Sequence, residues 1–486
     1  MTRTSILILL GLSLGTWGHL LAQTHTITWD SDPIDVAPNA YGNKGPKLVL
    51  DAEGNPVVML GHSNTGLFIV RQEDGVFGEP QSLTNALDVF ISDAEGADIA
   101  AQGNTLGVTF MIAGNWTTGA RFTRSDDGGA TWSVPVPMVP EGTNQDHFMP
   151  IPAWDDNGNP FAAVKYGNNP VTEGVLRSED GGATWLPSVD ANLAAGTGEV
   201  CECCPSRTTY HNGRYYSLFR NNNENVRDIW LVSSADGTTW DQTLDIDPTD
   251  WWIAACPETG ASVDWLPDNR LVSTFMSGGA GPSRVYVNVS DPENQDPGTT
   301  LLVTETQSSP SAENQPDVAS SSAFTVLTWE QNDGGYEIAV ALTTNDNLPQ
   351  GLVDQAFTVS DDLSGSNRHP DVAIHGNVVH LIWQNSQSGT VKYLRGTIDG
   401  TESVSTAPKR PIASLQRTGP STVQLSEATP MSSFDVLDAS GSLLHRGQCD
   451  ASGMAIIPDR FTHVPVLFVR TQDPDGPRLL RLGLAN

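Results

Sequence analysis

The stretch that decides the fold is Ser125-Asp126-Asp127-Gly128-Gly129-Ala130-Thr131-Trp132, because the chain contains three copies of it. The second copy is Ser178-Glu179-Asp180-Gly181-Gly182-Ala183-Thr184-Trp185, and the shorter third is Ser234-Ala235-Asp236-Gly237-Thr238-Thr239-Trp240. Each copy stands between two short apolar runs, which predicts a hairpin turn between strands. Ser and Asp bond local amides, the glycines adopt positive φ, and we expect each Trp to pack the hairpin onto its own sheet.

A longer repeat runs through the chain. A small or proline residue precedes an alternating strand, a turn with Gly or Asn follows, and a second strand ends in a polar cluster. The second residues of these units stand at positions 46, 97, 150, 205, 261, 316 and 370, so the spacings are 51, 53, 55, 56, 55 and 54 residues. A steady period of this length with about four short strands per unit is typical of propeller blades. We expect the first strands to surround one axis and to begin near Lys47, Asp98, Ile151, Ser206, Ser262, Asp317 and Asp371.

The three turn motifs resemble the Asp-box of the sialidase-like (BNR) β-propellers, where the motif is a structural turn far from the chemistry. The resemblance implies an all-β fold. Sialidases have six blades, whereas the repeat here predicts seven, with six as the alternative. The last unit lacks a fourth strand, and Thr26-Ile27-Thr28-Trp29 from the other end of the chain is the candidate that closes the ring.

Composition agrees with an exported β protein. The 486 residues include 46 Gly and 32 Pro, and no sustained 3.6-residue apolar period is present. A net charge of −32 argues against nucleic acid and anionic membranes as partners. Arg3, the apolar run 6–14 and the sequence ending at Gln23 predict a signal peptide over residues 1–23 and a secreted or cell-surface protein.

Beyond the predicted propeller (residues 24–400), a linker is expected over 401–414 and a small β-sandwich over 415–486. The strands predicted there lie at 433–438, 454–457 and 466–470, with a basic terminal strand over 478–484. This order resembles the C-terminal sorting domain of the bacterial type IX secretion system, which implies that secretion machinery as a partner. Pro465 departs from that family, which usually has Gly there. An ordinary accessory sandwich is the alternative.

Propeller geometry predicts where chemistry gathers. The loops that lead into first strands and those that follow second strands open on one face, here called the mouth face, and the Asp-boxes lie on the other. Polar residues far apart in sequence should meet on the mouth face and bind a ligand such as a carbohydrate. The candidate ligand-binding residues are His147, Arg220, Asn221, Arg227, Gln315, Arg368 and His369.

Four cysteines should also cluster on that face: Cys201, Cys203 and Cys204 before the fourth unit and Cys256 before the fifth. Disulfides are expected in an exported chain, and one between the two units would staple neighbouring blades. The alternative is a metal site in which these thiolates bind copper or zinc. The run Asp155-Asp156-Asn157-Gly158-Asn159 has oxygen ligands that could hold calcium, and an ordinary turn is the alternative.

Two other functions stay open at this point. The region of Arg227-Asp228-Ile229 and Cys256-Pro257 resembles a C-x-C-C-containing subset of sialidase-like bacterial proteins, usually labelled sialidase by fold. The resemblance implies an exo-sialidase-type glycoside hydrolase for acidic sugars, with Arg220, Arg284 and Arg368 as a partial arginine cluster and Tyr166 or Tyr286 as nucleophile. The first unit, however, has no arginine before Arg71. An envelope protein-binding or adhesion module is the third hypothesis; paired carboxylates at the mouth would favour the hydrolase, and a bare apolar mouth would favour the module.

Overall fold

The computed structural model divides the chain into two compact units, Met1–Gly400 and Thr401–Asn486. The first unit is described over residues 25–84, 87–192, 198–305, 312–360 and 363–399. The second is described over 414–419, 422–426, 433–437, 443–450, 454–457, 466–473 and 476–483. The predicted signal peptide and all of the predicted linker except Ser414 lie outside the described residues.

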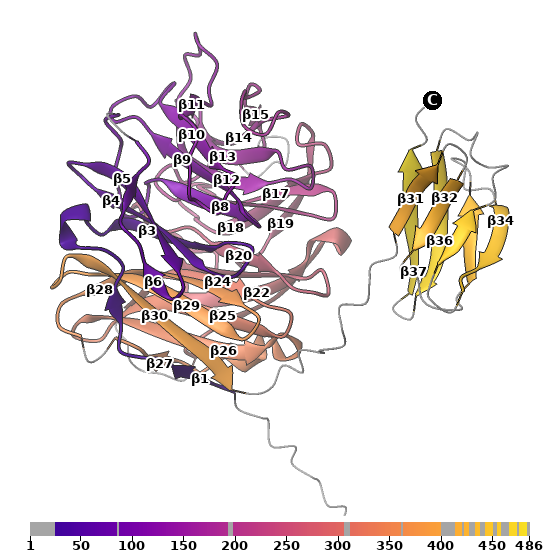
Figure 1. Cartoon of the computed structure of the whole chain (residues 1–486). Helices are drawn as coiled ribbons and strands as arrows, with labels where there is room; N and C mark the ends of the chain where they lie inside the picture. The colour runs from indigo at the N-terminus through magenta and orange to yellow at the C-terminus, as the bar shows by residue number, and fades with distance from the viewer. Residues whose placement is uncertain are drawn as a thin grey trace, which may run out of the picture. The chain divides into compact units, whose positions relative to one another are not determined.

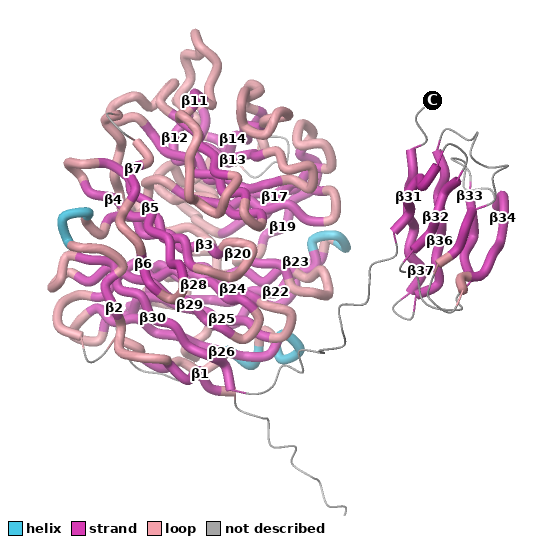
Figure 2. Tube along the Cα trace, in the orientation of Figure 1, coloured by secondary structure: helices cyan, strands magenta, loops and turns pink. Residues whose placement is uncertain are grey.

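The first unit is a β-propeller of seven antiparallel sheets, which confirms the seven-blade prediction (Figures 1 and 2). Its innermost strands, β3, β8, β12, β16, β20, β24 and β28, contact one another in a closed ring.

Blade one holds β3 (Lys44–Leu50), β4 (Pro56–His62), β5 (Gly66–Glu73), β6 (Val76–Phe77) and β7 (Gln81–Ser82); blade two holds β8 (Asp98–Gln102), β9 (Thr105–Met111), β10 (Ala120–Ser125) and β11 (Val136–Pro137). Blade three holds β12 (His147–Trp154), β13 (Pro160–Tyr166), β14 (Thr172–Arg177) and β15 (Val189–Asp190); blade four holds β16 (Arg207–His211), β17 (Arg214–Arg220), β18 (Ile229–Ser234) and β19 (Trp240–Asp245). Blade five holds β20 (Ser262–Trp265), β21 (Leu271–Ser277), β22 (Arg284–Asp291) and β23 (Asp296–Leu302); blade six holds β24 (Ala312–Ser320), β25 (Phe324–Asn332), β26 (Tyr336–Thr344) and β27 (Phe357–Thr358).

Strands from both ends of the propeller close the ring. Blade seven contains β28 (Asn367–His375), β29 (Val378–Asn385) and β30 (Thr390–Asp399). Its outer strand is β1 (Thr26–Trp29), which pairs antiparallel with β30, and β2 (Ile34–Asp35) also pairs with β30. In Figure 1 the indigo β1 accordingly lies beside the orange β30. The closure predicted from the sequence is therefore confirmed.

Helical structure is confined, within the described residues, to four single turns of 3₁₀ helix: η1 (Asn39–Tyr41), η2 (Pro292–Asn294), η3 (Asn345–Asn347) and η4 (Gln350–Leu352). None of these is long or apolar enough to cross a membrane.

An apolar cluster lies between each pair of neighbouring blades, so the core is divided into seams rather than gathered at the axis. Between blades five and six, for example, Val287 packs with Leu327 and the fully buried Trp329. Burying the facing sides of adjacent sheets is the main source of stability in such a ring, because the apolar area leaves water at every seam.

The Asp-box turns are held by the bonds that their residue types predict. The Ser125 hydroxyl accepts the amide of Gly129 at 2.8 Å, and the Asp127 carboxylate accepts the amide of Thr131 at 2.8 Å. The second and third boxes repeat these contacts. The hydroxyl of Thr131, and to a smaller extent its amide and the Ser125 hydroxyl, lower the pKa of Asp127 to about 2.

The Asp-box tryptophans pack differently from our expectation. Trp132 lies against the cluster shared by blades one and two, and Trp185 meets Phe122 of the preceding blade with ring centroids 5.2 Å apart. Trp240 is likewise buried between blades three and four. Each Trp therefore fills the seam towards the preceding blade as well as its own sheet, because the turn lies at the edge where two sheets meet.

The boxes form a row on the face opposite the mouth. Each box follows the third strand of its blade, and this strand is parallel to the first, so the box and the start of the first strand lie at opposite ends. Arg124, just before the first box, donates to the carbonyl of Gly181 in the second at 2.9 Å. Arg177 donates likewise to Asp236 in the third at 3.2 Å. These bonds confirm that the turns gather on one face, away from Cys204.

The second unit has two antiparallel sheets. One contains β31 (Ser414–Gly419), β32 (Thr422–Ser426) and β35 (Ala455–Ile457). The other contains β34 (Leu443–Gln448), β33 (Ser433–Leu437), β36 (Val466–Asp473) and β37 (Gly476–Gly483), in this order across the sheet. The strands predicted near 433, 454, 466 and 478 are therefore present.

Candidate functional site

A bulge at the start of four inner strands aims one side chain of each at the axis. The pairing of the first two strands shifts between Lys44 and Lys47, and at the equivalent place in blades three, six and seven. In each bulge the residue before the proline has a φ near +50°: Gly45, Met149, Gln315 and His369. This left-handed conformation is costly for residues other than glycine, so its recurrence marks a shared geometry. The residue after the proline consequently lines the axial pocket: Lys47, Ile151, Asp317 and Asp371.

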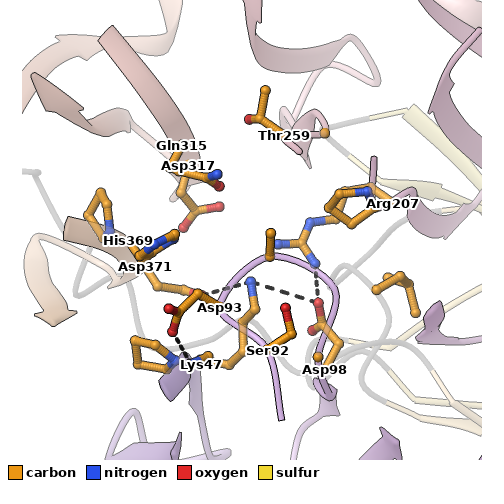
Figure 3. A pocket seen from close by; sticks show the side chains of 18 of the residues that line it. Lys47, Ser92, Asp93, Asp98, Arg207, Thr259, Gln315, Asp317, His369 and Asp371 are labelled. Atoms are coloured by element: carbon orange, nitrogen blue, oxygen red, sulfur yellow. Dashed lines mark hydrogen bonds and ion pairs between the residues drawn. The ribbon is translucent and has the colours of Figure 1, made fainter. Parts of the chain in front are cut away.

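The axial pocket is small and strongly polar (Figure 3). Its volume is about 50 Å³, which is room for a few waters or for one protruding group of a larger ligand. Six charged side chains line it: Lys47, Asp98, Arg207, Asp317 and Asp371 from five blades, and Asp93 from the segment that leads into blade two. Convergence of charges from separate blades at one point is what a binding site requires, and a purely structural channel does not need it.

On one side of the pocket Asp98 lies between two cations. Arg207 Nη1 is 2.5 Å from Asp98 Oδ2, and Lys47 Nζ is 3.9 Å from the same oxygen. Burial alone would raise the pKa of Asp98, but the charges of Arg207 and Lys47 outweigh it and hold that pKa below its ordinary value. Asp98 is therefore an anion at neutral pH.

On the other side two carboxylates face each other in different environments. Asp317 accepts the hydroxyl of Ser262 at 2.5 Å and the amide of Val372 at 2.8 Å. Asp371 has Lys47 Nζ at 3.9 Å as its charged partner. Burial, and next the negative charge of Asp317, raise the pKa of Asp371 well above its usual range. Figure 3 shows Lys47 with one dashed line to Asp98 and another to Asp371.

The rim of the pocket contains two residues predicted from the sequence. Gln315 and His369 both line it, and Gln315 donates to the carbonyl of Glu258 at 3.1 Å. Burial lowers the pKa of His369, so its imidazole is neutral at neutral pH. Arg368 stands beside it, with its guanidinium bound to Glu330 at 2.8 Å and stacked on the ring of Tyr336.

The other predicted ligand-binding residues lie below the surface and do not line the axial pocket. His147 is buried between the Gln145 carbonyl and the Ser188 hydroxyl. Arg220 is fully buried, and its guanidinium donates to three backbone carbonyls, which is the geometry of a structural arginine. Asn221 and Arg227 are buried too; Asn221 accepts the amide of Asp228 at 2.8 Å.

All four predicted cysteines do cluster. Cys203 and Cys256 form a disulfide with Cα atoms 6.1 Å apart, so the predicted staple between blades four and five is confirmed. Cys201 and Cys204 are buried thiols with Sγ atoms 2.8 Å apart. A thiolate metal site would in this state have only these two ligands, because disulfide sulfurs are poor ones. None of the four lines the axial pocket.

Arginine surrounds the Cys201 thiol. Arg227 Nη1 lies 2.9 Å from Cys201 Sγ. The hydrogen bond from Cys204, followed by the charges of Arg227 and Arg220 against the opposing effect of burial, lowers the pKa of Cys201 to about 6. Burial conversely raises the pKa of Cys204. The two thiols are thus a nucleophile and its hydrogen-bond donor.

The run considered for calcium forms a hydrogen-bonded turn. Asp155 Oδ1 accepts the amides of Asn157 and Asn159, each at 2.9 Å, and Oδ2 accepts the Tyr215 hydroxyl. These bonds use both oxygens of Asp155 inside the fold.

The charged residues of the pocket were missed as site residues, although the repeat located them. Lys47, Asp98, Asp317 and Asp371 were expected only as the beginnings of inner strands. The sequence did contain a signal: Lys47, Asp317 and Asp371 each follow the proline of their repeat and Asp98 follows the equivalent Ala97, and a charged residue at the start of an inner strand is unusual in a core.

Comparison with known proteins agrees with the repeat. Residues 100–273 match the family described as BNR repeat-like domain. A search of curated proteins gave no match. Among solved structures, a protein of unknown function from Dyadobacter fermentans is 14% identical, covering 65% of this chain and 98% of that chain with a TM-score of 0.43. An α-L-arabinofuranosidase from Fusarium graminearum is 16% identical, with coverages of 64% and 93% and a TM-score of 0.41. An α-L-arabinanase from Penicillium chrysogenum is 13% identical, with coverages of 65% and 99% and a TM-score of 0.41. Likenesses this distant carry no argument about activity; the chain is a seven-bladed propeller with a BNR repeat-like region.

Proposed function

We propose that this propeller binds a carbohydrate in the axial pocket, with one sugar hydroxyl or hydroxymethyl group entering the charged centre. The observation that carries the proposal is the convergence of Lys47, Asp98, Arg207, Asp317 and Asp371. The carboxyl groups of the lining accept hydrogen bonds and the two cationic groups donate them, so the pocket presents both functions to a ligand. Hydroxyl groups both donate and accept hydrogen bonds, and such a mixed lining suits them better than it suits an ion of either sign.

Exposed aromatic side chains on the mouth face support the same ligand class. Trp116 follows the second strand of blade two and is 40% exposed; Trp252 precedes the inner strand of blade five and is 64% exposed. Loops in both of these positions open on the mouth face. A flat apolar ring next to polar groups is a common platform for the face of a sugar.

Hydrolysis of the bound sugar is the second candidate. Burial and the charge of Asp317 raise the pKa of Asp371, and a carboxyl group with a raised pKa beside a second carboxylate is the arrangement used in glycoside hydrolysis. Support for the acidic-sugar version is weaker, because Arg207 is the single arginine lining the pocket among the described residues. Arg220 is buried, and Arg368 is bound to Glu330.

The test combines binding with turnover. Wild-type protein and the Asp371→Asn variant would be incubated with a panel of neutral and acidic oligosaccharides. Binding in both with cleavage by the wild type alone would support the hydrolase. Binding in both without cleavage would support a lectin-like module, and no binding would contradict the proposal.

Export and metal binding remain proposals beside this one. We propose that the chain is secreted through its N-terminal segment and that the second unit is the sorting signal, on the sequence grounds given above. Copper or zinc at Cys201 and Cys204 would be two-coordinate from this cluster, which fits Cu(I) better than Zn²⁺. Elemental analysis of the purified mature protein tests that version.

A further inference from the structure

The cysteines at the seam between blades four and five form two pairs in opposite redox states. The Cys203–Cys256 disulfide joins the segments that lead into β16 and β20. The Cys201 and Cys204 thiols lie directly beside it, 2.8 Å from each other. Cys201 Sγ is also 3.5 Å from Cys203 Sγ. A nucleophilic thiol thus stands next to the disulfide and next to a second thiol.

We propose that these four cysteines exchange disulfides, so that the buried dithiol opens the staple from inside. The net reaction converts the Cys201/Cys204 dithiol and the Cys203–Cys256 disulfide into a Cys201–Cys204 disulfide and the Cys203 and Cys256 thiols. One pair is oxidised and the other is reduced by the same two electrons. No external oxidant or reductant is consumed, and the reverse reaction closes the staple again.

Two displacements accomplish the exchange. The Cys201 thiolate, to which Arg227 donates at 2.9 Å, attacks Cys203 Sγ, forms the Cys201–Cys203 bond and breaks the bond to Cys256. Cys256 leaves as a thiolate and takes up the proton that Cys201 lost. The Cys204 thiol then gives up its proton and attacks Cys201 Sγ, and Cys203 leaves as a thiolate and takes up that proton. Each attack begins from a contact already present, at 3.5 Å and 2.8 Å.

The exchange would act on the mouth. Cys256 is exposed, unlike the other three, and lies in the connection between β19 and β20. This connection carries Trp252 and continues into Thr259 and Gly260, which line the axial pocket. Opening the staple removes the covalent tie that holds the connection against blade four. The redox state of the four cysteines would therefore control how mobile the β19–β20 connection is, and with it one wall of the axial pocket, whatever ligand the pocket binds.

The experiment uses the purified full chain with two thiols among the four seam cysteines, as in the structure, incubated at neutral pH until the exchange reaches equilibrium. The protein is quenched in acid, alkylated and digested with a Glu-specific protease, which cuts after Glu202 and so separates Cys201 from Cys203 and Cys204. Mass spectrometry should find two populations: one with Cys203 linked to Cys256, and one with Cys201 linked to Cys204 and alkylated Cys256. A Cys201→Ser variant should lower the alkylation of Cys256 by about tenfold or more, because it lacks the attacking thiol.

Further variants locate the steps. Cys204→Ser should stop the exchange after the first displacement, leaving Cys201 linked to Cys203 with Cys256 alkylated. Cys449→Ser, in the second unit, is the control and should change nothing at the seam. A wild-type protein with the Cys203–Cys256 link alone would overturn the proposal even if every variant misfolded. Unchanged Cys256 alkylation in Cys201→Ser, or zinc or copper bound at the two thiols, would overturn it equally.

Discussion

Arg207 of the fourth blade donates to Asp98 of the second blade across the axial pocket, with Nη1 2.5 Å from Oδ2. The bond thus joins two blades that are not neighbours in the ring, and the two residues are 109 positions apart in the sequence. It fixes the guanidinium over the pocket and holds Asp98 ionised.

We expect this pair to behave as a coupled unit. Arg207→Met should destabilise the propeller by on the order of 2 kcal/mol, because it leaves a buried carboxylate without its main partner. Adding Asp98→Asn should recover most of the loss, since the Asn oxygen can still accept the amide of Ile99. Chemical denaturation of the two single variants and the double variant measures the coupling energy. Additive effects would mean that the two side chains do not interact.

The Cys203–Cys256 disulfide should stabilise the fold much more than a contact between surface side chains does. A link between residues 53 positions apart restricts the unfolded chain by about 4 kcal/mol in the chain-entropy account. Cys256→Ser should therefore lower the melting temperature clearly while leaving metal content unchanged. Loss of bound metal with an unaltered melting temperature would instead support the metal site.

Buried Asp247 gives the propeller a pH dependence of known sign. Burial raises its pKa to about 7, opposed by the charge of Arg220. A raised folded-state pKa contributes stability at pH values below the unfolded pKa, and this contribution is lost as the pH rises from about 4 to 7. The free energy of unfolding of Asp247→Asn, relative to that of the wild type, should thus increase by at least about 1 kcal/mol from pH 4 to pH 8, since one pKa unit corresponds to about 1.4 kcal/mol. Urea unfolding at a series of pH values checks this, with Asp333→Asn, in an exposed turn, as control. If the stability of Asp247→Asn relative to the wild type instead decreased as the pH rises, the predicted direction of the pH dependence would be wrong.

The second unit should be dispensable for folding. Removal of residues 401–486 should leave a propeller with an unaltered melting temperature, because the chain divides into separate compact units at that point. Expressed in a host with type IX secretion, the truncated chain should no longer reach the cell surface. An unfolded truncated protein would make the second unit part of the core, and normal surface delivery would disprove the sorting role.

Repetition explains what could be predicted from the sequence. The spacing of the seven proline or alanine residues at the repeat positions located the inner strands, and Thr26–Trp29 was identified because one blade lacked a strand. The approach of Cys203 to Cys256 followed from the adjacency of blades four and five. Which cysteines bond did not follow, because four cysteines permit three pairings and neighbouring backbones permit more than one.

Side-chain direction explains what was missed. Arg220 and Arg227 stand at strand ends, where arginines are usually solvated, yet both turn inward to backbone carbonyls. Asp317 and Asp371 stand at positions that a simple alternating pattern cannot distinguish from other strand residues. The bulge at Gln315 and His369 decides that they face the axis, and positive φ at non-glycine residues has no sequence signature.

Equilibrium binding of an oligosaccharide panel to the full chain, followed by calorimetry on the best ligand, tests the axial pocket as a carbohydrate site. We expect one ligand per chain, and affinity about 10- to 100-fold weaker in Lys47→Met, which removes a charged hydrogen-bond donor from the pocket. Asp333→Asn, away from the pocket lining, should bind as the wild type does. Absence of binding across the panel, or equal affinity in Lys47→Met and the wild type, would contradict the proposed site.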